Sequence, residues 1–463
     1  MSDARVSDLL AEVGVPCACG DRTTIEGEDP VLPVTFPIGE RAAVALAACA
    51  SVASLLWAER TGRSQDVGVA VPQAAASLIS FTFLRVDGRP LPGNDSVARS
   101  ALVALHQCRD GRWIHLHGAT PKLQAGTLKV LGCEAEPAEV AAAVGRWDSS
   151  ELEDALAAEG TCGAIVRTAS EWATHPQGQA VGALARVEVT KVAEGEPGPV
   201  GDGLRPLGGV RVLDLTRVLA GPTHGRVLAE HGADVLLVNS PTLPNVPGFV
   251  IDTSHGKLST FLDLDEPADT TRLLELLGTA DVFAQGYRSG ALERRGLGVE
   301  DVVEVAAKAG RGIVYVTINC YGDTGPWRTR PGWEQLAQSV TGLAAAHGTP
   351  EQPVLMPAAA CDYTTGYLAA LGTMAALWRR ATEGGSYHVR ASLCQTGMWL
   401  ERGGPLYDRS GATGLGGLGG WMTESDTPWG RLSHLAPVAR MSDTPPQWER
   451  PSSPLGSDPP RWP

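Results

Sequence analysis

Aromatic side chains are scarce in this sequence: Phe, Trp and Tyr together make up 5% of its 463 residues. A core with so few rings must be filled by Ala, Val and Leu on closely packed helices and strands. Charged residues are also few, at 19%, whereas 43% of the residues are apolar, which excludes a chain that is disordered throughout. The length is sufficient for two or three domains of ordinary size.

Basic residues are in deficit, because 38 Lys and Arg face 52 Asp and Glu and the formal net charge is −14. An acidic surface repels nucleic acid and anionic membranes, so we expect neither as a partner. A local basic pocket for a small anion is compatible with this balance.

Targeting and metal-binding signals are missing as well. The first residues carry no basic stretch followed by an apolar one, and the apolar run Ala42–Trp57 is too short and too often interrupted by serine to span a bilayer. The nine cysteines have no disulfide framework spacing, and Cys17-Ala18-Cys19 lacks a second pair for zinc. We therefore expect reduced thiols, no metal site and a cytoplasmic location.

A change of pattern follows the Gly- and Pro-rich stretch Glu194–Pro206, which is typical of a linker. Val210–Leu215 reads as a strand, Pro222–His231 as a helix and Ala233–Val238 as a second strand. This β-α-β order predicts an α/β fold, with an open doubly wound (Rossmann-like) large domain over residues 206–400.

The rest of the chain divides into three parts. Residues 1–80 predict a helix-strand-helix segment that packs on the large domain, and residues 81–205 a small α+β domain with its linker. Residues 401–463 show no periodic element and predict an extended Gly/Pro-rich tail that packs through Trp421, Trp429, Trp448 and Trp462.

Two segments resemble each other. Asp362–Ser392 and Arg41–Val71 both read as helix, glycine turn and strand, and each has a Leu-Trp pair near the end of its helix. Asp362 lies sixteen residues before Trp378, and Arg41 lies sixteen residues before Trp57. The segments look like copies, in which Arg41 takes the place of Asp362.

A series of phrases between residues 207 and 400 resembles the large domain of the family III CoA-transferases, which include formyl-CoA transferase and α-methylacyl-CoA racemase. The series contains Arg211-Val212-Leu213-Asp214-Leu215, Ala220-Gly221-Pro222, Gly232-Ala233-Asp234-Val235, Gly256-Lys257, Tyr287-Arg288-Ser289-Gly290, Tyr321-Gly322-Asp323-Thr324-Gly325-Pro326-Trp327 and Asp362-Tyr363. Several blocks in one order and spacing form a strong signal, although each block alone is weak.

The resemblance extends to the first 200 residues in an unusual order. Thr61–Val67 resembles the segment after the family's catalytic helix, Asp110–Ile114 its small domain, and the pair Glu171-Trp172 with His175-Pro176-Gln177 the stretch that follows. The chain is thus similar to a family member with its halves permuted. The resemblance implies a homodimer, which permutation makes less certain than for an ordinary member.

The resemblance implies Asp362 as the catalytic group. A carboxylate can attack an acyl-CoA thioester to give an acyl-aspartyl anhydride and the CoA thiolate. The alternative is that Asp362 caps the helix that follows it, a role for which its position before Tyr363 is well suited. Both roles are compatible with each other.

Five further residues are expected to contact coenzyme A. Arg217 and Ala220 stand where a strand ends and a helix starts, and a helix N-terminus favours anions. Lys257 and Arg288 are cations in matching phrases, suited to phosphate, and Gly322 is expected to shape a loop near the thioester.

The implied activity is CoA transfer between an acyl-CoA and a small carboxylic acid, with CoA thioester as substrate and no permanently bound cofactor. Leu219 stands where formyl-CoA transferase has Gln, which argues against oxalate or formate as substrates. One alternative is an acyl-CoA racemase, but Gly332-Trp333-Glu334 replaces the family's Gly-His-Asp phrase and removes the second base. Another is a CoA-binding paralogue without turnover.

Overall fold

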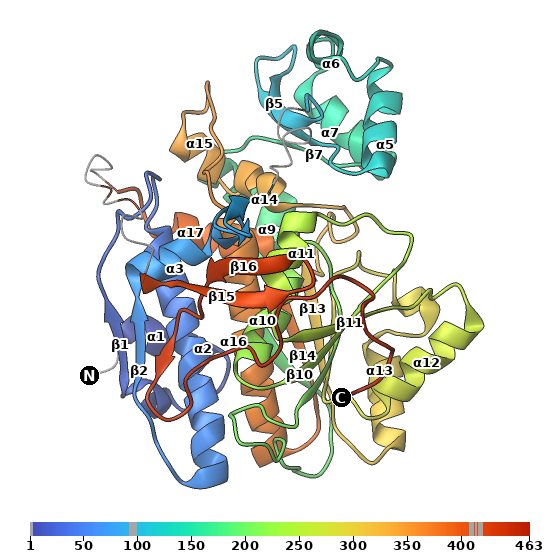
Figure 1. Ribbon diagram of the computed structural model, residues 1–463. Coiled ribbons are helices and arrows are strands. Elements are labelled where there is room, and N and C mark those ends of the chain that lie inside the picture. Colours follow the sequence, from blue (N-terminus) through green and yellow to red (C-terminus); the bar gives the residue numbers. More distant parts are fainter. Residues whose placement is uncertain (1–2, 92–99, 407–411, 413, 415–419) are drawn as a thin grey trace.

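The computed structural model describes residues 3–91, 100–406, 412, 414 and 420–463. Its largest element is a seven-stranded sheet in the order β11-β10-β9-β12-β13-β14-β8 (Figure 1). Neighbouring strands are parallel, except that β8 runs antiparallel to β14. The strands are β8 (Glu188–Ala193), β9 (Arg211–Leu215), β10 (Asp234–Asn239), β11 (Lys257–Phe261), β12 (Val282–Gln285), β13 (Val314–Asn319) and β14 (Ser386–Ser392). The predicted α/β fold is confirmed.

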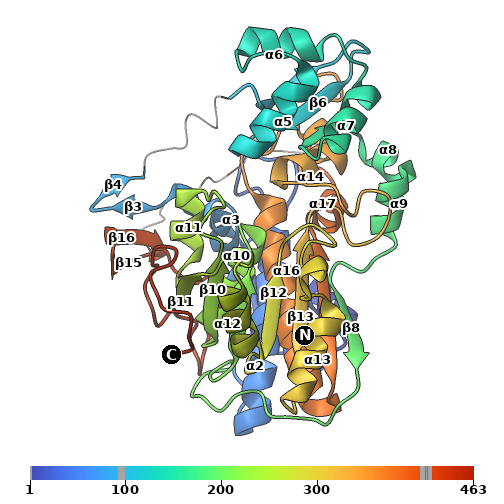
Figure 2. The ribbon, with the colours of Figure 1, turned by 90° about the vertical axis from the view of Figure 1, so that its right-hand side faces the viewer.

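Helices cover both faces of this sheet (Figure 2). In β9, Val212 packs into the core with α10 (Ala220–Glu230) and α16 (Ala360–Glu383). Leu213 and Leu215 belong to the core with α12 (Pro267–Leu277) and α13 (Val299–Lys308). Parallel strands buried on both faces have continuous apolar runs, which is why the β-α-β pattern was readable in the sequence.

A small domain lies above the carboxyl ends of the strands (Figure 1). It holds the sheet β5-β6-β7 and its own core, around Ile114 and Leu116. Its elements are β5 (Val103–Gln107), β6 (Trp113–His117), β7 (Gly163–Ile165), α5 (Pro121–Leu131), α6 (Pro137–Val144) and α7 (Ser149–Ala158).

The expected boundaries of this domain, 81–205, need correction. The strand β8 belongs to the main sheet. β3 (Arg85–Val86) pairs with the C-terminal strand β16, and β4 (Arg89–Pro90) pairs with β3. The helices α8 (Ala169–Thr174) and α9 (Pro176–Gly182) lead from the small domain back to β8. Sequence alternation identifies a strand but not the sheet that it joins, which explains the error.

The N-terminal segment packs on the large domain through α2 (Ile38–Thr61), which lies beside α16. The helix α2 is long and apolar enough to cross a membrane, but 83% of its most apolar window is buried inside the protein. It is therefore a core helix. The segment also contains α1 (Ala4–Glu12), β1 (Thr23–Glu26), β2 (Val67–Ala70) and α3 (Val71–Ser77).

The internal repeat is present, but its register differs from the expected one. A constant offset of 322 residues relates the two copies. It holds for the first residues of the helices (Ile38 and Ala360), for their last residues, and for the last residues of the strands. Glu40, and not Arg41, is therefore the counterpart of Asp362. Arg41 instead stacks on the ring of Trp399, with 5.2 Å from its Cζ to the ring centre.

The C-terminal residues contain strands, contrary to the expected extended tail. β15 (Met422–Thr427) and β16 (Gly430–Leu435) form a hairpin, and β17 (Arg440–Met441) pairs with β2. The last residues do run extended along the outer edge of β11, where the N–H of Asp458 donates to the carbonyl of Ser259 at 2.7 Å. Residues 415–419 of the glycine run lie outside the described residues.

Three further α-helices lie between strands of the main sheet: α11 (Pro247–Thr253), α14 (Glu334–Val340) and α15 (Leu343–His347). The helix α17 (Leu393–Glu401) follows the last of these strands, β14.

Candidate active site

Asp362 lies in the first turn of α16, and a second carboxylate caps that turn. The backbone N–H of Asp362 donates to Oε2 of Glu334 at 2.6 Å, and the N–H of Cys361 donates to Oε1 at 3.2 Å. Gln338 also donates to Oε1, at 2.8 Å. Glu334 thus takes the capping role that the sequence offered to Asp362 itself. Within the described residues, no hydrogen bond or ion pair holds the carboxylate of Asp362.

The surroundings make Asp362 a weaker acid. Its residue is 8% exposed, and burial together with the charge of Glu334 raises its pKa well above the usual range. Burial likewise raises the pKa of Glu334, although hydrogen bonds from Gln338, Asp362 and Cys361 oppose this. A carboxylate with a raised pKa is a better nucleophile once it is ionised, because its charge is less solvated.

The start of α10 lies directly against α16. A Cβ built on Gly366, one turn after Asp362, would meet the carbonyl oxygen of Ala220 at 2.6 Å. Only glycine permits this approach, so Gly366 allows the N-terminus of α10 to lie beside the turn that carries Asp362. The structure thus brings Ala220 and Asp362, two of the predicted site residues, to the same place.

Lys257 does not lie where a phosphate could reach it, and its predicted role needs correction. Its side chain is fully buried, and Nζ donates to Oδ2 of Asp214 at 3.0 Å and to the carbonyl of Pro222 at 2.7 Å. A buried charge needs such partners. Lys257 therefore links Asp214 of β9 to the first turn of α10.

Arg217 lines a pocket of about 280 Å³ at the carboxyl ends of β9 and β10. Its Nε and Oγ of Ser254 in the same wall are both buried, and neither has a hydrogen-bond partner among the residues that the structure describes. The next residue, Val218, has a φ of 71°, a strained conformation for a β-branched residue. The other lining residues are Thr216, Val218, Pro222, Leu237, Asn239, Asn245, Val246, Val250, Thr253 and Leu455.

Arg288 follows β12 and faces the small domain. Its Nη2 donates to the carbonyl of Gly160 at 3.2 Å. Nearby, the ring of Trp333 stacks on His117 of β6, with 4.6 Å between the ring centres. Trp333 therefore fills the expected position of the second base with an interdomain contact that has no acid-base function.

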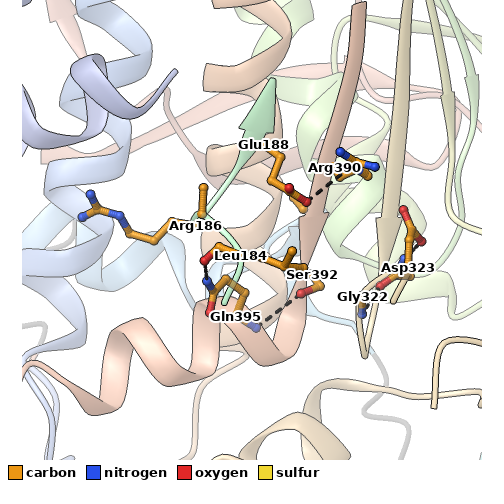
Figure 3. A pocket seen from close by; sticks show the side chains of 11 residues that line it. Leu184, Arg186, Glu188, Gly322, Asp323, Arg390, Ser392 and Gln395 are labelled. Carbon is orange, nitrogen blue, oxygen red and sulfur yellow. Dashed lines mark hydrogen bonds and ion pairs between the residues drawn. The ribbon is translucent and has the colours of Figure 1, made fainter. Parts of the chain in front are cut away.

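Gly322 lies in the loop after β13, with a φ of 82°, and lines a second pocket of about 270 Å³ (Figure 3). This pocket also contains Asp323, Arg390 and Gln395, and Glu188 pairs with Arg390 at 3.3 Å. Burial raises the pKa of Asp323. None of the residues that line this pocket is shared with the Arg217 pocket.

Gln177 fixes the loop that contains Gly322, a role that sequence reasoning missed. Its Nε2 donates to the carbonyls of Tyr321 (2.7 Å) and Thr324 (2.9 Å), and its Oε1 accepts the N–H of Trp327 at 2.7 Å. Two phrases of the family resemblance, about 145 residues apart in the chain, thus bond to each other. Their presence in one family pattern was the only signal of this contact.

A sequence model of CoA-transferase family III matches residues 9–197 and 207–415. The chain is 34% identical over 343 residues to the acetyl-coenzyme A transferase nodX of Hypoxylon pulicicidum, covering 70% of this chain and 58% of that protein. It is 36% identical over 329 residues to an acyl-CoA transferase of Gibberella moniliformis, covering 66% of this chain and 58% of that protein.

Human succinyl-CoA:glutarate CoA-transferase is 34% identical over 213 residues, which cover 43% of this chain and 48% of that protein. The chain thus spans about half the length of the curated relatives that it matches. The family match covers most of the chain, including both helices of the repeat and the capped turn with Asp362. The chain belongs to CoA-transferase family III.

Proposed function

We propose that the protein transfers coenzyme A between an acyl-CoA thioester and a carboxylic acid, with Asp362 as the nucleophile. The observation that carries this proposal is the capped turn of α16. Glu334 caps the backbone N–H groups of Cys361 and Asp362, and among the described residues nothing bonds the carboxylate of Asp362, which leaves it available for reaction.

In the proposed reaction, the carboxylate of Asp362 attacks the thioester carbonyl. The C–S bond breaks, the CoA thiolate leaves, and an acyl-aspartyl anhydride remains. The thiolate then attacks the aspartyl carbonyl and releases the first acid as its carboxylate. The incoming acid attacks the aspartyl thioester, which releases the CoA thiolate and forms a second anhydride. The thiolate then attacks the acyl carbonyl of this anhydride, which gives the new acyl-CoA and restores the carboxylate of Asp362.

Arg217, Ala220, Arg288 and Gly322 are our candidates for contact with coenzyme A. The pocket beside Arg217 offers an unpartnered guanidinium nitrogen next to the start of α10, where backbone N–H groups favour phosphate. The proposal also includes a homodimer and a cytoplasmic location. All nine cysteines are free, which is consistent with a reducing compartment.

The test is a comparison of Asp362→Asn with Asp323→Asn. A panel of acyl-CoAs and free acids is incubated with each protein, and exchanged CoA esters are detected by mass. We expect Asp362→Asn to lose transfer by about a thousandfold or more. Asp323→Asn, which changes a half-buried carboxylate in the other pocket, should retain most of it. Hydroxylamine should trap the wild-type acyl enzyme on the peptide with Asp362. An Asp362→Asn protein with near-normal transfer would remove Asp362 from the mechanism.

A further inference from the structure

The N-terminal segment repeats the capped turn of the candidate active site. Oδ2 of Asp29 accepts the backbone N–H of Glu40 at 2.8 Å, as Oε2 of Glu334 accepts that of Asp362 at 2.6 Å. The strands after the two helices also match: β2 lies between parallel β1 and antiparallel β17, and β14 lies between parallel β13 and antiparallel β8. The likeness therefore extends to strand order and to the caps of the helices.

The two repeated helices run parallel, side by side (Figure 1). Sγ of Cys49 donates to the carbonyl of Tyr367 at 3.0 Å, and further along Nε1 of Trp378 donates to Oε1 of Glu59 at 3.3 Å. Nearly constant spacing between the contacting residues is the mark of a parallel pair. Glu40 and Asp362 consequently lie at the same end of the pair.

Glu40 differs from Asp362 in its partners. Its Oε2 is paired with Nη1 of Arg5 at 2.6 Å, and its Oε1 accepts the N–H of Asp29 at 3.3 Å. A carboxylate held by a guanidinium is a poor nucleophile, because the cation stabilises its charge.

The copy also lacks the parts that would bind a CoA thioester. Only two residues lie between the end of β1 and Asp29, whereas fourteen lie between the end of β13 and Glu334, so the copy has no loop like that of Gly322. Residues 3–77 contain no counterpart of β9 or β10, at whose carboxyl ends the Arg217 pocket lies.

We propose that residues 3–77 are a catalytically silent copy of the site region, whose helix α2 acts as a built-in partner that supports α16. Each chain then has one reacting carboxylate, Asp362, with Glu40 as its silent counterpart. The assignment of Asp362 rests on the proposed function, whereas the supporting role of α2 does not.

The chemical part of the proposal is tested with Glu40→Gln and Arg5→Ala beside Asp362→Asn. We expect both N-terminal variants to retain transfer within about twofold, with one trapped acyl group per chain, on Asp362. Arg5→Ala is the sharper variant, because it frees Glu40 without supplying a CoA site. A second adduct on the Glu40 peptide, or a loss in Glu40→Gln as large as that in Asp362→Asn, would overturn the proposal. If the wild-type protein itself showed neither CoA transfer nor a trapped acyl group, the proposed function would be contradicted instead.

The supporting role of α2 is tested without activity, by hydrogen exchange of the full chain. Ala53 is buried in α2, and Ala53→Gly should lower the protection of α2 and α16 together, by about fivefold or more. The matched control is Ala143→Gly in α6, which also replaces a buried helical alanine and should affect only the small domain. Undiminished protection of α16 in Ala53→Gly would overturn the supporting role, whatever the chemical activity of the protein.

Discussion

The carboxylate of Glu334 accepts the backbone N–H of Asp362 at 2.6 Å, so two buried carboxyl groups lie at the first turn of α16. The Glu334 carboxylate accepts backbone N–H groups of this turn, whereas the Asp362 carboxylate has no hydrogen bond or ion pair in the described part of the chain. Because one carboxylate caps the helix and the other is left to react, the rate of transfer should depend on pH in a way that can be measured.

The rate should rise with pH through a pKa above that of an ordinary aspartate, because only ionised Asp362 can attack and its pKa is raised. Glu334→Gln keeps an acceptor for the cap but removes the neighbouring charge, so the midpoint should move to lower pH. The measurement is kcat/KM against pH for both proteins. An unchanged midpoint would contradict the assigned role of Glu334.

Lys257 and Arg288 should behave in opposite ways when they are replaced. Lys257→Met leaves Asp214 buried and unpaired, which should lower the free energy of unfolding by about 3–5 kcal/mol. Arg288→Ala should leave stability within about 0.5 kcal/mol and raise KM for acyl-CoA. Urea unfolding and steady-state kinetics separate the two effects, and a stable Lys257→Met protein with only a raised KM would restore the phosphate role of Lys257.

Gln177→Ala should loosen the loop after β13. The change leaves two carbonyls and the N–H of Trp327 without a partner, at a cost of about 1–3 kcal/mol. Gln177→Glu keeps the acceptor for Trp327 but sets a carboxylate against two carbonyl oxygens, so it should be no better than Ala. Thermal unfolding of the three proteins tests this order, and a wild-type Tm for Gln177→Ala would show that the loop does not depend on these bonds.

Glu230, at the end of α10, should make stability fall as pH rises. Burial raises its pKa to about 8, against opposing effects of Arg226 and Arg205. Between about pH 4.3 and pH 8 the unfolded chain loses this proton while the folded chain keeps it. The free energy of unfolding should therefore decrease across that window, by a few kcal/mol as an order of magnitude. Glu230→Gln should flatten the profile in urea titrations at pH 5.5 and 8.5, and an identical slope in both proteins would exclude Glu230 as its source.

The sequence predicted the elements whose signal is local. The linker and the β-α-β order were readable, because each buried parallel strand is a continuous apolar run. Asp362 was identified because it stands in a family phrase.

The contacts that complete the site could not be predicted in this way. Glu334 and Asp362 are 28 residues apart, and no periodicity links them. The burial of Lys257 follows from the pairing of β11 with β10, which places Nζ beside Asp214. Which strands pair in a sheet depends on the tertiary structure and cannot be read from the pattern of a single strand.

The register of the repeat was missed by one residue for a different reason. Trp57 and Trp378 suggested Arg41 as the counterpart of Asp362, but helix ends are set by backbone caps. Gly62 and Gly384 end α2 and α16, both with positive φ, and their alignment gives Glu40. The glycines were visible in the sequence, so the correct register was available there.

The extended residues beside β11 should affect the solubility of the protein. β11 is the outermost strand of the main sheet, and an uncovered parallel edge offers unpaired N–H and carbonyl groups to another molecule. Asp458 binds Ser259 through both its backbone N–H and its carboxylate, so the chain covers part of this edge itself. Variants that detach this segment should therefore aggregate through β11 before the region around α16 unfolds.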